Sequence, residues 1–195
     1  MDEINIYVAS ASNSRKQLAK EYNLDWIFVN NEFNEEKIKN NLIVNNFEDV
    51  LKYTKILSMG KAESVIHKYN GIIIGCDSVA YQKGKILEKP KDEIEFYKMM
   101  EDITTNLHYL VTAISIINTI NGKIIKFVEI TKLFFDKFTT EQKLYLLNEC
   151  NGLSNAGGYT LCDKIKQNTH IIKGDRNNVI GLPIKRIQKE ICNIL

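Results

Sequence analysis

A continuous apolar run at residues 71–76 ends directly in Asp77, and this run constrains the fold of the chain more than any other feature. An unbroken series of apolar residues, without polar alternation, is typical of a strand buried on both faces in the middle of a sheet. We therefore expect a central strand with the Asp77 carboxylate at its carboxyl end. Open sheets bind their ligands at such strand ends.

A predicted hairpin follows this strand. Residues 79–81 and 85–87 flank Gln82-Lys83-Gly84, and Lys89 and Pro90 come directly afterwards. A carboxylate and a lysine held close together can serve a metal-bound phosphate, the first by holding the cation or orienting water and the second by neutralising phosphate charge. On residue types alone, however, a turn aspartate and a solvated lysine are the simpler explanation.

Small polar residues separate the first predicted strand, residues 4–9, from a predicted helix over residues 14–22. Ser12 or Asn13 is expected to cap this helix. Backbone N–H groups at a helix N-terminus bind anions, whereas Arg15 and Lys16 in the first turn are unfavourable there unless an anion offsets them. The segment is thus a candidate phosphate cradle, although a serine cap with two surface cations explains the same residues.

The order of the predicted elements indicates the fold class. Units of strand and helix alternate with antiparallel hairpins, which predicts an α/β protein with a mixed central sheet. The length of 195 residues suits one large domain or two closely packed lobes. The other expected elements are strands at 25–31, 107–117, 123–135 and 169–173, helices at 47–69, 92–100, 139–149 and 182–194, a mobile polar excursion at 34–46, a glycine-rich loop at 151–158 and a polar turn at 175–178.

Composition argues against several classes of protein. A formal net charge of +2 is too small for the dense basic face of most nucleic-acid-binding domains, so no nucleic-acid partner is expected. The apolar runs are far shorter than the ~20 residues of a membrane helix, and no signal peptide pattern is present. The cysteines lack paired spacing and the histidines are scattered, so we expect free thiols in the cytoplasm and no zinc site. The four cysteines are Cys76, Cys150, Cys162 and Cys192.

Short motifs along almost the whole chain together resemble those of the Maf family, also called septum formation inhibitor proteins. Each motif is unspecific alone, but their order and spacing are specific. The matching segments are Val8 to Arg15, Phe33 to Glu35, Met59 to Ala62, Gly75 to Ser78, Ile86 to Pro90, His108 to Thr112, Asn155 to Tyr159 and Asn178 to Pro183.

This resemblance implies a fold, an activity and an assembly. The fold would be a single Maf-like domain over residues 1–195, with a twisted mixed sheet flanked by helices in two lobes around a cleft, as in inosine triphosphatases. The activity would be hydrolysis of a nucleoside triphosphate to the monophosphate and pyrophosphate. A divalent cation, Mg²⁺ or Mn²⁺, and a homodimer are also implied.

The resemblance also implies residue roles. Asp77 would be the general base or water-orienting carboxylate, and Glu35 would join Asp77 in holding the metal. Lys61 and Lys89 would contact the phosphates as part of the catalytic group. The substrate-binding residues would be Ser10, Ser12, Ser14, Arg15, Ser78, Cys162 and Asn178.

Several positions depart from the family pattern. Ser14 and Asn155 stand where the family has an arginine and a lysine. Ser14, Ser78 and Cys162 occupy positions associated with base choice, and they match neither the dTTP/UTP group nor the 7-methyl-GTP group, so the preferred base stays open. A catalytically weak nucleotide-binding regulator of cell division is therefore the alternative to an enzyme. A Nudix hydrolase is disfavoured because no helix carries its clustered carboxylates.

Overall fold

The structure, a computed structural model, describes residues 4–39, 44–104 and 106–195. Within these residues a seven-stranded sheet has the order β2-β1-β3-β5-β6-β7, and β4 pairs with β3. The strands are β1 (Ile6–Ala9), β2 (Ile27–Val29), β3 (Ile72–Gln82), β4 (Lys85–Leu87), β5 (His108–Asn118), β6 (Ile124–Phe135) and β7 (Thr169–Lys173). The helices are α1 (Asn13–Glu21), α2 (Glu35–Lys39), α3 (Phe47–Glu63), α4 (Glu93–Ile103), α5 (Thr140–Asn148), α6 (Arg176–Ile180) and α7 (Ile184–Ile194), with short 3-10 turns at 152–154, 156–158 and 163–168.

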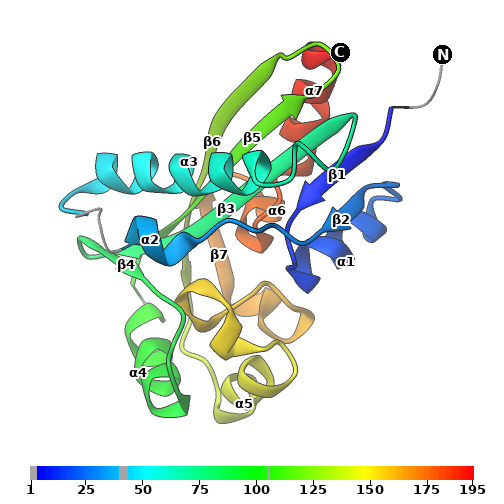
Figure 1. Cartoon of the computed structure of the whole chain (residues 1–195). Helices are drawn as coiled ribbons and strands as arrows, with labels where there is room; N and C mark the ends of the chain where they lie inside the picture. The colour runs from blue at the N-terminus through cyan, green and yellow to red at the C-terminus, as the bar shows by residue number, and fades with distance from the viewer. Residues whose placement is uncertain (1–3, 40–43, 105) are drawn as a thin grey trace.

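The sheet is mixed, which confirms the expected α/β class. Strand β1 pairs in parallel with β2 and β3, whereas β3, β5, β6 and β7 pair in antiparallel fashion. Helix α3 crosses one face of the sheet, and α1 and α7 pack on the other (Figure 1). Helices α4 and α5 and the 3-10 turns form a second lobe below them (Figure 1).

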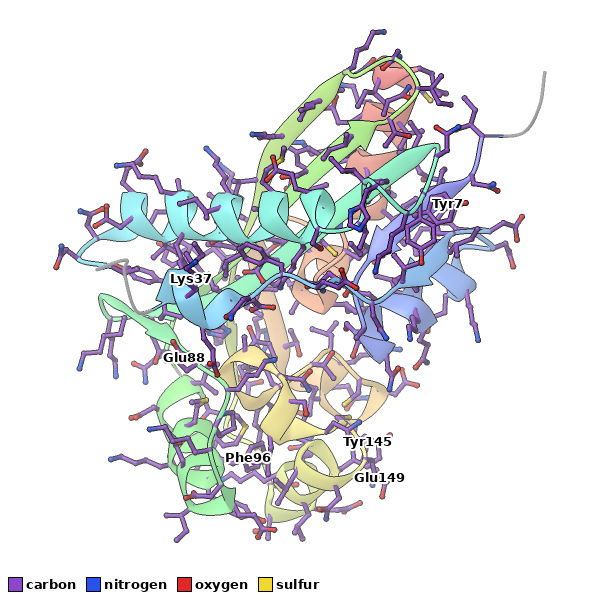
Figure 2. The ribbon with its side chains drawn as sticks, in the orientation of Figure 1. Tyr7, Lys37, Glu88, Phe96, Tyr145 and Glu149 are labelled. Carbon is purple, nitrogen blue, oxygen red and sulfur yellow. The ribbon has the colours of Figure 1, made fainter. Side chains whose placement is uncertain are left out.

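Strand β3 belongs to both lobes. Ile73 and Val79 pack on the α3 side, and Ile74 packs with α1 and α7. Ala80, further along the same strand, joins the core of the second lobe, which contains Phe96 of α4 (Figure 2). Because one sheet runs through both cores, we propose that residues 1–195 form a single domain.

The expectation that β3 ends at Asp77 is wrong. The strand continues to Gln82, so Asp77 lies in its middle. Strand β5 pairs with β3 as far as Tyr81, but the opposite edge of β3 has two separate partners. There β1 pairs with residues 72–74 and β4 with residues 80–82, which leaves residues 75–79 without a strand partner on that edge among the described residues.

Some local sequence signals predicted the observed structure. Ser12, one of the two caps expected for the first helix, caps α1; Asn46 caps α3, and Thr139 forms a capping box with Gln142. Lys83 and Gly84 both have positive φ, as a two-residue hairpin turn requires. The sequence predictions were wrong at α2, which forms in the segment expected to be a mobile excursion, at α3, which ends at Glu63, and at 175–178, where α6 begins. Residues 40–43 of that excursion lie outside the described residues.

The sequence analysis also led to expectations about the state of the cysteines and about membrane-spanning helices. All four cysteines are free thiols. In the part of the chain that the structure describes, none of the helices combines the length and apolar character needed to cross a bilayer.

Gly75 lets α3 lie directly on β3. A Cβ atom at this position would lie 2.0 Å from the backbone oxygen of Ser58 and 2.8 Å from the backbone nitrogen of Ala62. Any larger residue would push the helix away from the strand. The glycine thus brings the last turns of α3 over the middle of β3, where Asp77 lies.

Arg15 joins three segments of the fold. Its buried guanidinium donates hydrogen bonds to Ser10 Oγ (3.0 Å), the Cys76 carbonyl oxygen (3.2 Å), Ser78 Oγ (2.9 Å) and the Gly181 carbonyl oxygen (2.8 Å). The bond to Cys76 satisfies a carbonyl on the unpaired edge of β3. A planar guanidinium can reach these four acceptors at once, whereas the single ammonium of a lysine cannot.

We therefore expect Arg15→Lys to lower the free energy of unfolding by about 2 kcal/mol or more, because buried acceptors would lose their donors. Urea denaturation would measure this. Lys20→Arg exchanges the same residue types at an exposed position of α1 and should stay within about 0.5 kcal/mol of wild type. An Arg15→Lys protein as stable as the Lys20→Arg control would contradict the role of the guanidinium.

His108 is fully buried between the sheet and the second lobe. Its Nε2 lies 2.9 Å from the Tyr159 hydroxyl, and burial lowers the pKa of His108 to about 4. The unfolded chain binds a proton near pH 6.5 and the folded chain only near pH 4. Protonation therefore favours the unfolded state, so stability falls as the pH drops from 6.5 towards 4 and is fully present above 6.5.

We expect His108→Gln to reduce this pH dependence. The stability of the wild type relative to the variant should fall by up to about 3 kcal/mol between pH 6.5 and pH 4. Tyr159→Phe should keep the dependence, because burial and not the tyrosine hydroxyl lowers the pKa. Denaturation curves at several pH values test both variants, and parallel curves for wild type and His108→Gln would refute the assignment.

Candidate active site

A cleft of about 740 Å³ opens at the unpaired edge of β3. The first lobe contributes residues of α1, α2 and α3, and the second contributes Ser154 to Ala156, Tyr159 and Thr160. Glu88, just after β4, also lines the cleft and lies between α2 and α4 (Figure 2). The cleft therefore lies between the two lobes, at the place where β3 lacks a neighbouring strand.

Three charged side chains meet on the α3 side of β3. The Lys61 Nζ atom lies 2.5 Å from Asp77 Oδ1 and 3.0 Å from Glu35 Oε1. Lys61 and Asp77 are 8% and 6% exposed, whereas the Glu35 side chain is about half exposed. Burial alone would lower the pKa of Lys61, but Asp77 and Glu35 together raise it above its usual range. Lys61 is thus a buried ammonium shared by two carboxylates.

Helix α3 presents one face to the cleft. Tyr53, Leu57 and Lys61 follow each other at four-residue spacing and all line it. Burial, followed by the nearby charges of Asp77, Glu88 and Glu35, raises the pKa of Tyr53 far above its usual range. Its phenol therefore stays protonated beside the carboxylates and is available as a neutral hydrogen-bond donor.

Glu35 is positioned by a contact that its own motif does not reveal. The ring of Phe33 lies against Gly60, where an added Cβ would come within 2.2 Å of the ring. The segment before α2 is thereby fixed on α3 next to Lys61. The side chain of a larger residue at position 60 would displace Phe33 and, with it, the Glu35 carboxylate.

The opposite side of the β3 edge carries hydroxyl groups and Arg15. Ser12, at the start of α1, lines the cleft together with Ser14. Ser78 also lines it and shares hydrogen bonds with Arg15 and with Thr112 Oγ1 (2.8 Å). Lys89 is exposed and reaches the cleft from the segment after β4. Most of the predicted site residues are therefore close together.

Three predicted substrate-binding residues do not line the cleft. Ser10 is buried and accepts a hydrogen bond from Arg15, which it helps to orient. Asn178 is fully buried, and its Nδ2 contacts Leu110 O, Glu129 O and Thr131 Oγ1 at 3.0–3.3 Å. Such an amide fixes α6 to the sheet. Direct substrate contact is therefore not supported at Ser10 or Asn178.

Cys162, the third of these residues, belongs to the second lobe. It packs against the core of that lobe, where a hydrogen bond from Cys150 lowers the pKa of the Cys162 thiol despite its partial burial. Backbone N–H groups of Lys164 and Ile165 act in the same direction. Its position outside the cleft lining gives no support to direct substrate contact.

The inner wall of the cleft is largely apolar. Leu110, Val179, Ile180 and the buried Tyr159 line it, and Leu110, Val179 and Tyr159 belong to one apolar core. Asn155 lines the same region but donates its amide to the backbone oxygens of Cys150 and Asn151. Such a wall suits a flat, weakly polar group.

Tyr53 and Glu88 are lining residues that the sequence analysis did not identify. Tyr53 recurs in the sequence with the apolar residues of its helix, a pattern that indicates packing in the core rather than a place in the cleft. Its spacing from Lys61 is the signal that could have placed both residues on one side of the helix. Glu88 precedes Lys89 directly, and a carboxylate beside a lysine on a solvent-facing segment gives no comparable signal.

The site also offers oxygen ligands for a cation. Asp77 Oδ2 is buried and has no hydrogen-bond partner among the described residues, and Glu35 supplies a second carboxylate nearby. Carboxylate oxygens are the ligands that Mg²⁺ prefers, and Mg²⁺ commonly uses one or two of them together with substrate phosphates. The described residues include no cluster of three or more His, Cys, Asp or Glu side chains suited to a metal. The residues fit a cation that phosphate oxygens help to hold.

Comparisons with known proteins identify the same family as the sequence motifs. The family model described as Maf-like protein matches residues 5–194. The dTTP/UTP pyrophosphatase of Clostridium novyi is 32% identical over 186 residues, and that of Clostridium acetobutylicum is 30% identical over 194 residues, each alignment covering 94% of both chains.

A solved structure, the nucleoside-triphosphatase / dITP/XTP pyrophosphatase of Mycobacterium abscessus, has 13% identity and a TM-score of 0.41 over 77% of this chain and 97% of that chain; a likeness this weak supports no argument. The family match, in contrast, extends over nearly every described residue and includes every motif that supplies a side chain to the cleft. This chain belongs to the Maf-like protein family.

Proposed function

We propose that this protein is a nucleoside triphosphate pyrophosphatase, which hydrolyses its substrate between the α and β phosphates to a nucleoside monophosphate and pyrophosphate. The Clostridium relatives are named for this class of reaction. The observation that carries the proposal is the Asp77–Lys61–Glu35 group at the edge of one cleft that Arg15 and Lys89 also line.

The phosphate chain of the substrate would lie along the charged side of the cleft. Arg15 makes its four hydrogen bonds to neutral oxygens, and none of its described contacts is a carboxylate. Its positive charge is therefore available to attract an anion. Together with Lys61 and Lys89, it would neutralise negative charge that moves towards the leaving pyrophosphate.

Asp77 is the best candidate for the general base. Lys61 holds Oδ1, and the partnerless Oδ2 is free to accept a proton from a water molecule that attacks the α phosphorus. Before nucleotide binds, the Lys61 ammonium fixes the orientation of the carboxylate. Glu35 and Asp77 would hold Mg²⁺ or Mn²⁺, which when bound would neutralise phosphate charge and polarise the phosphoryl group.

The nucleoside would face the apolar wall that includes Leu110, Val179 and Tyr159. The names of the relatives make dTTP and UTP the first substrates to examine, whereas Ser14 and Ser78 depart from that group. We propose that these differences alter base preference rather than abolish the reaction, since Arg15, Lys61 and Lys89, which would serve the phosphates, are kept. Action in the cytoplasm and assembly as a homodimer stay predictions.

A regulator of cell division that binds nucleotides without cleaving them is the second candidate. Ser14 and Asn155 both line the cleft without supplying a cation, which favours weaker phosphate binding. The buried Lys61–Asp77 pair argues against this alternative. A buried ion pair costs desolvation energy, and a protein that only bound nucleotide would gain little from keeping one.

We expect Asp77→Asn to reduce kcat at least 10²-fold, and about 10⁴-fold at most, because a positioned base contributes in this range. Steady-state pyrophosphate release measures the loss, and the thermal unfolding midpoint checks that the variant is folded. Asp102→Asn makes the same change at an exposed position of α4 and should keep wild-type activity. Near-normal turnover by Asp77→Asn would refute the assigned base.

A substrate screen tests the reaction itself. Canonical and modified nucleoside triphosphates, with dTTP and UTP included, are each incubated with Mg²⁺ or Mn²⁺. We expect pyrophosphate and the monophosphate as products, because cleavage falls between the α and β phosphates. Orthophosphate as the product would contradict the cleavage position, and binding without any product would favour the regulator.

A further inference from the structure

The Lys61 ammonium stands where a divalent cation would need to contact the protein. Its Nζ bridges Asp77 Oδ1 at 2.5 Å and Glu35 Oε1 at 3.0 Å. These two carboxylates are the ones that would bind the metal. The described residues include no cluster of three or more metal-binding side chains that could replace them. In the nucleotide-free protein, one positive charge already occupies the pair.

Lys61 is held in place between the two carboxylates. Its side chain is buried, and its Nζ lies within hydrogen-bonding distance of both Asp77 and Glu35. Met59-Gly60-Lys61 lies in the last turn of α3, where a positive side chain is also favoured by the helix dipole. A divalent cation that approached the carboxylates would meet this ammonium at close range and be repelled.

A triphosphate changes this balance. Its oxygens offer the ammonium new acceptors, and the flexible lysine stem allows Nζ to move towards them without moving the helix. The same oxygens can complete the coordination of a cation that has only two protein carboxylates. Arg15 lines the same cleft, and its positive charge attracts the triphosphate to the neighbourhood of the pair.

We propose that Lys61 keeps the Asp77–Glu35 pair closed to divalent cations until nucleotide phosphates bind its ammonium, so that the metal enters together with the triphosphate. This inference rests on the proposed function. It predicts that nucleotide-free protein binds metal poorly and that loss of the ammonium, although it should damage turnover, improves binding of the metal alone.

The test measures binding of Mn²⁺ alone to nucleotide-free protein by electron paramagnetic resonance, which detects free Mn²⁺ directly. Lys61→Met and Lys61→Gln should each bind Mn²⁺ at least about tenfold more tightly than wild type, because each vacates the carboxylates. Glutamine keeps a hydrogen-bond donor for Asp77, so Lys61→Gln provides a second variant if Lys61→Met does not fold. Adding Glu35→Gln to either variant should abolish the gain, which would locate it at this pair.

Lys89→Met is the matched control for net charge. Lys89 lines the same cleft but forms no ion pair with either carboxylate within the described residues. Its removal should change Mn²⁺ affinity by less than about threefold, since the effect of an exposed charge is screened by solvent. An equal gain in Lys89→Met and Lys61→Met would overturn the inference, because overall charge would then explain both.

Wild-type protein gives an independent answer. The inference would be overturned if nucleotide-free wild-type protein bound Mn²⁺ at the Asp77–Glu35 pair as tightly as the Lys61 variants do. If those variants do not fold, micromolar binding of Mn²⁺ to the wild type that Glu35→Gln abolishes would also overturn it. The substrate screen separates this failure from failure of the proposed function. Pyrophosphate release with tight metal binding to the free protein would refute only the order of binding, whereas absence of any hydrolysis would refute the function.

Discussion

The free edge of β3 between its two partners is the constraint on which the site depends. Strand β1 stops at Ala9, where the chain turns into α1, and β4 begins only after the hairpin turn. An interior strand edge leaves backbone groups that must find other partners. The guanidinium of Arg15 supplies such a partner by donating a hydrogen bond to the Cys76 carbonyl oxygen. The cleft opens along the rest of this edge. Because side chains alternate along a strand, the Asp77 side chain points towards α3 and the Ser78 side chain points towards α1.

The two buried cations beside this edge have different electrostatic surroundings. Lys61 is paired with two carboxylates, whereas the described contacts of Arg15 are carbonyl and hydroxyl oxygens. Hydrogen bonds to neutral oxygens orient a guanidinium but leave its net charge in place. The Asp77–Lys61–Glu35 group thus carries a net negative charge on one side of β3, whereas Arg15 places an uncompensated positive charge on the other. An anion entering the cleft is drawn first by Arg15 and can then compete for Lys61.

The sequence predicted what is local and missed what depends on neighbouring segments. The cap of the first helix and the hairpin turn follow from residues within four positions of each other, and both were found in the structure. The true length of β3 was missed because it depends on where β1 and β4 stop beside it. The role of Gly60 could not be predicted for the same reason, since it requires the ring of Phe33 from a distant segment. The family motifs identified Asp77, Lys61 and Glu35, but they also included Asn178, whose buried amide serves the fold.

The residues that line the cleft meet two different demands. Most of the charged groups come from α1, α2, α3 and the segment after β4, whereas the inner apolar wall of Leu110, Val179, Ile180 and Tyr159 comes from β5, α6 and the second lobe. Electrostatic demands on a triphosphate are the same whatever base it carries, so the charged groups have little freedom to change. The apolar wall would contact a group that differs among nucleotides, and substitutions there change fit without removing charge. Ser14 and Asn155 line the cleft outside the Asp77–Lys61–Glu35 group, so both departures leave that group intact.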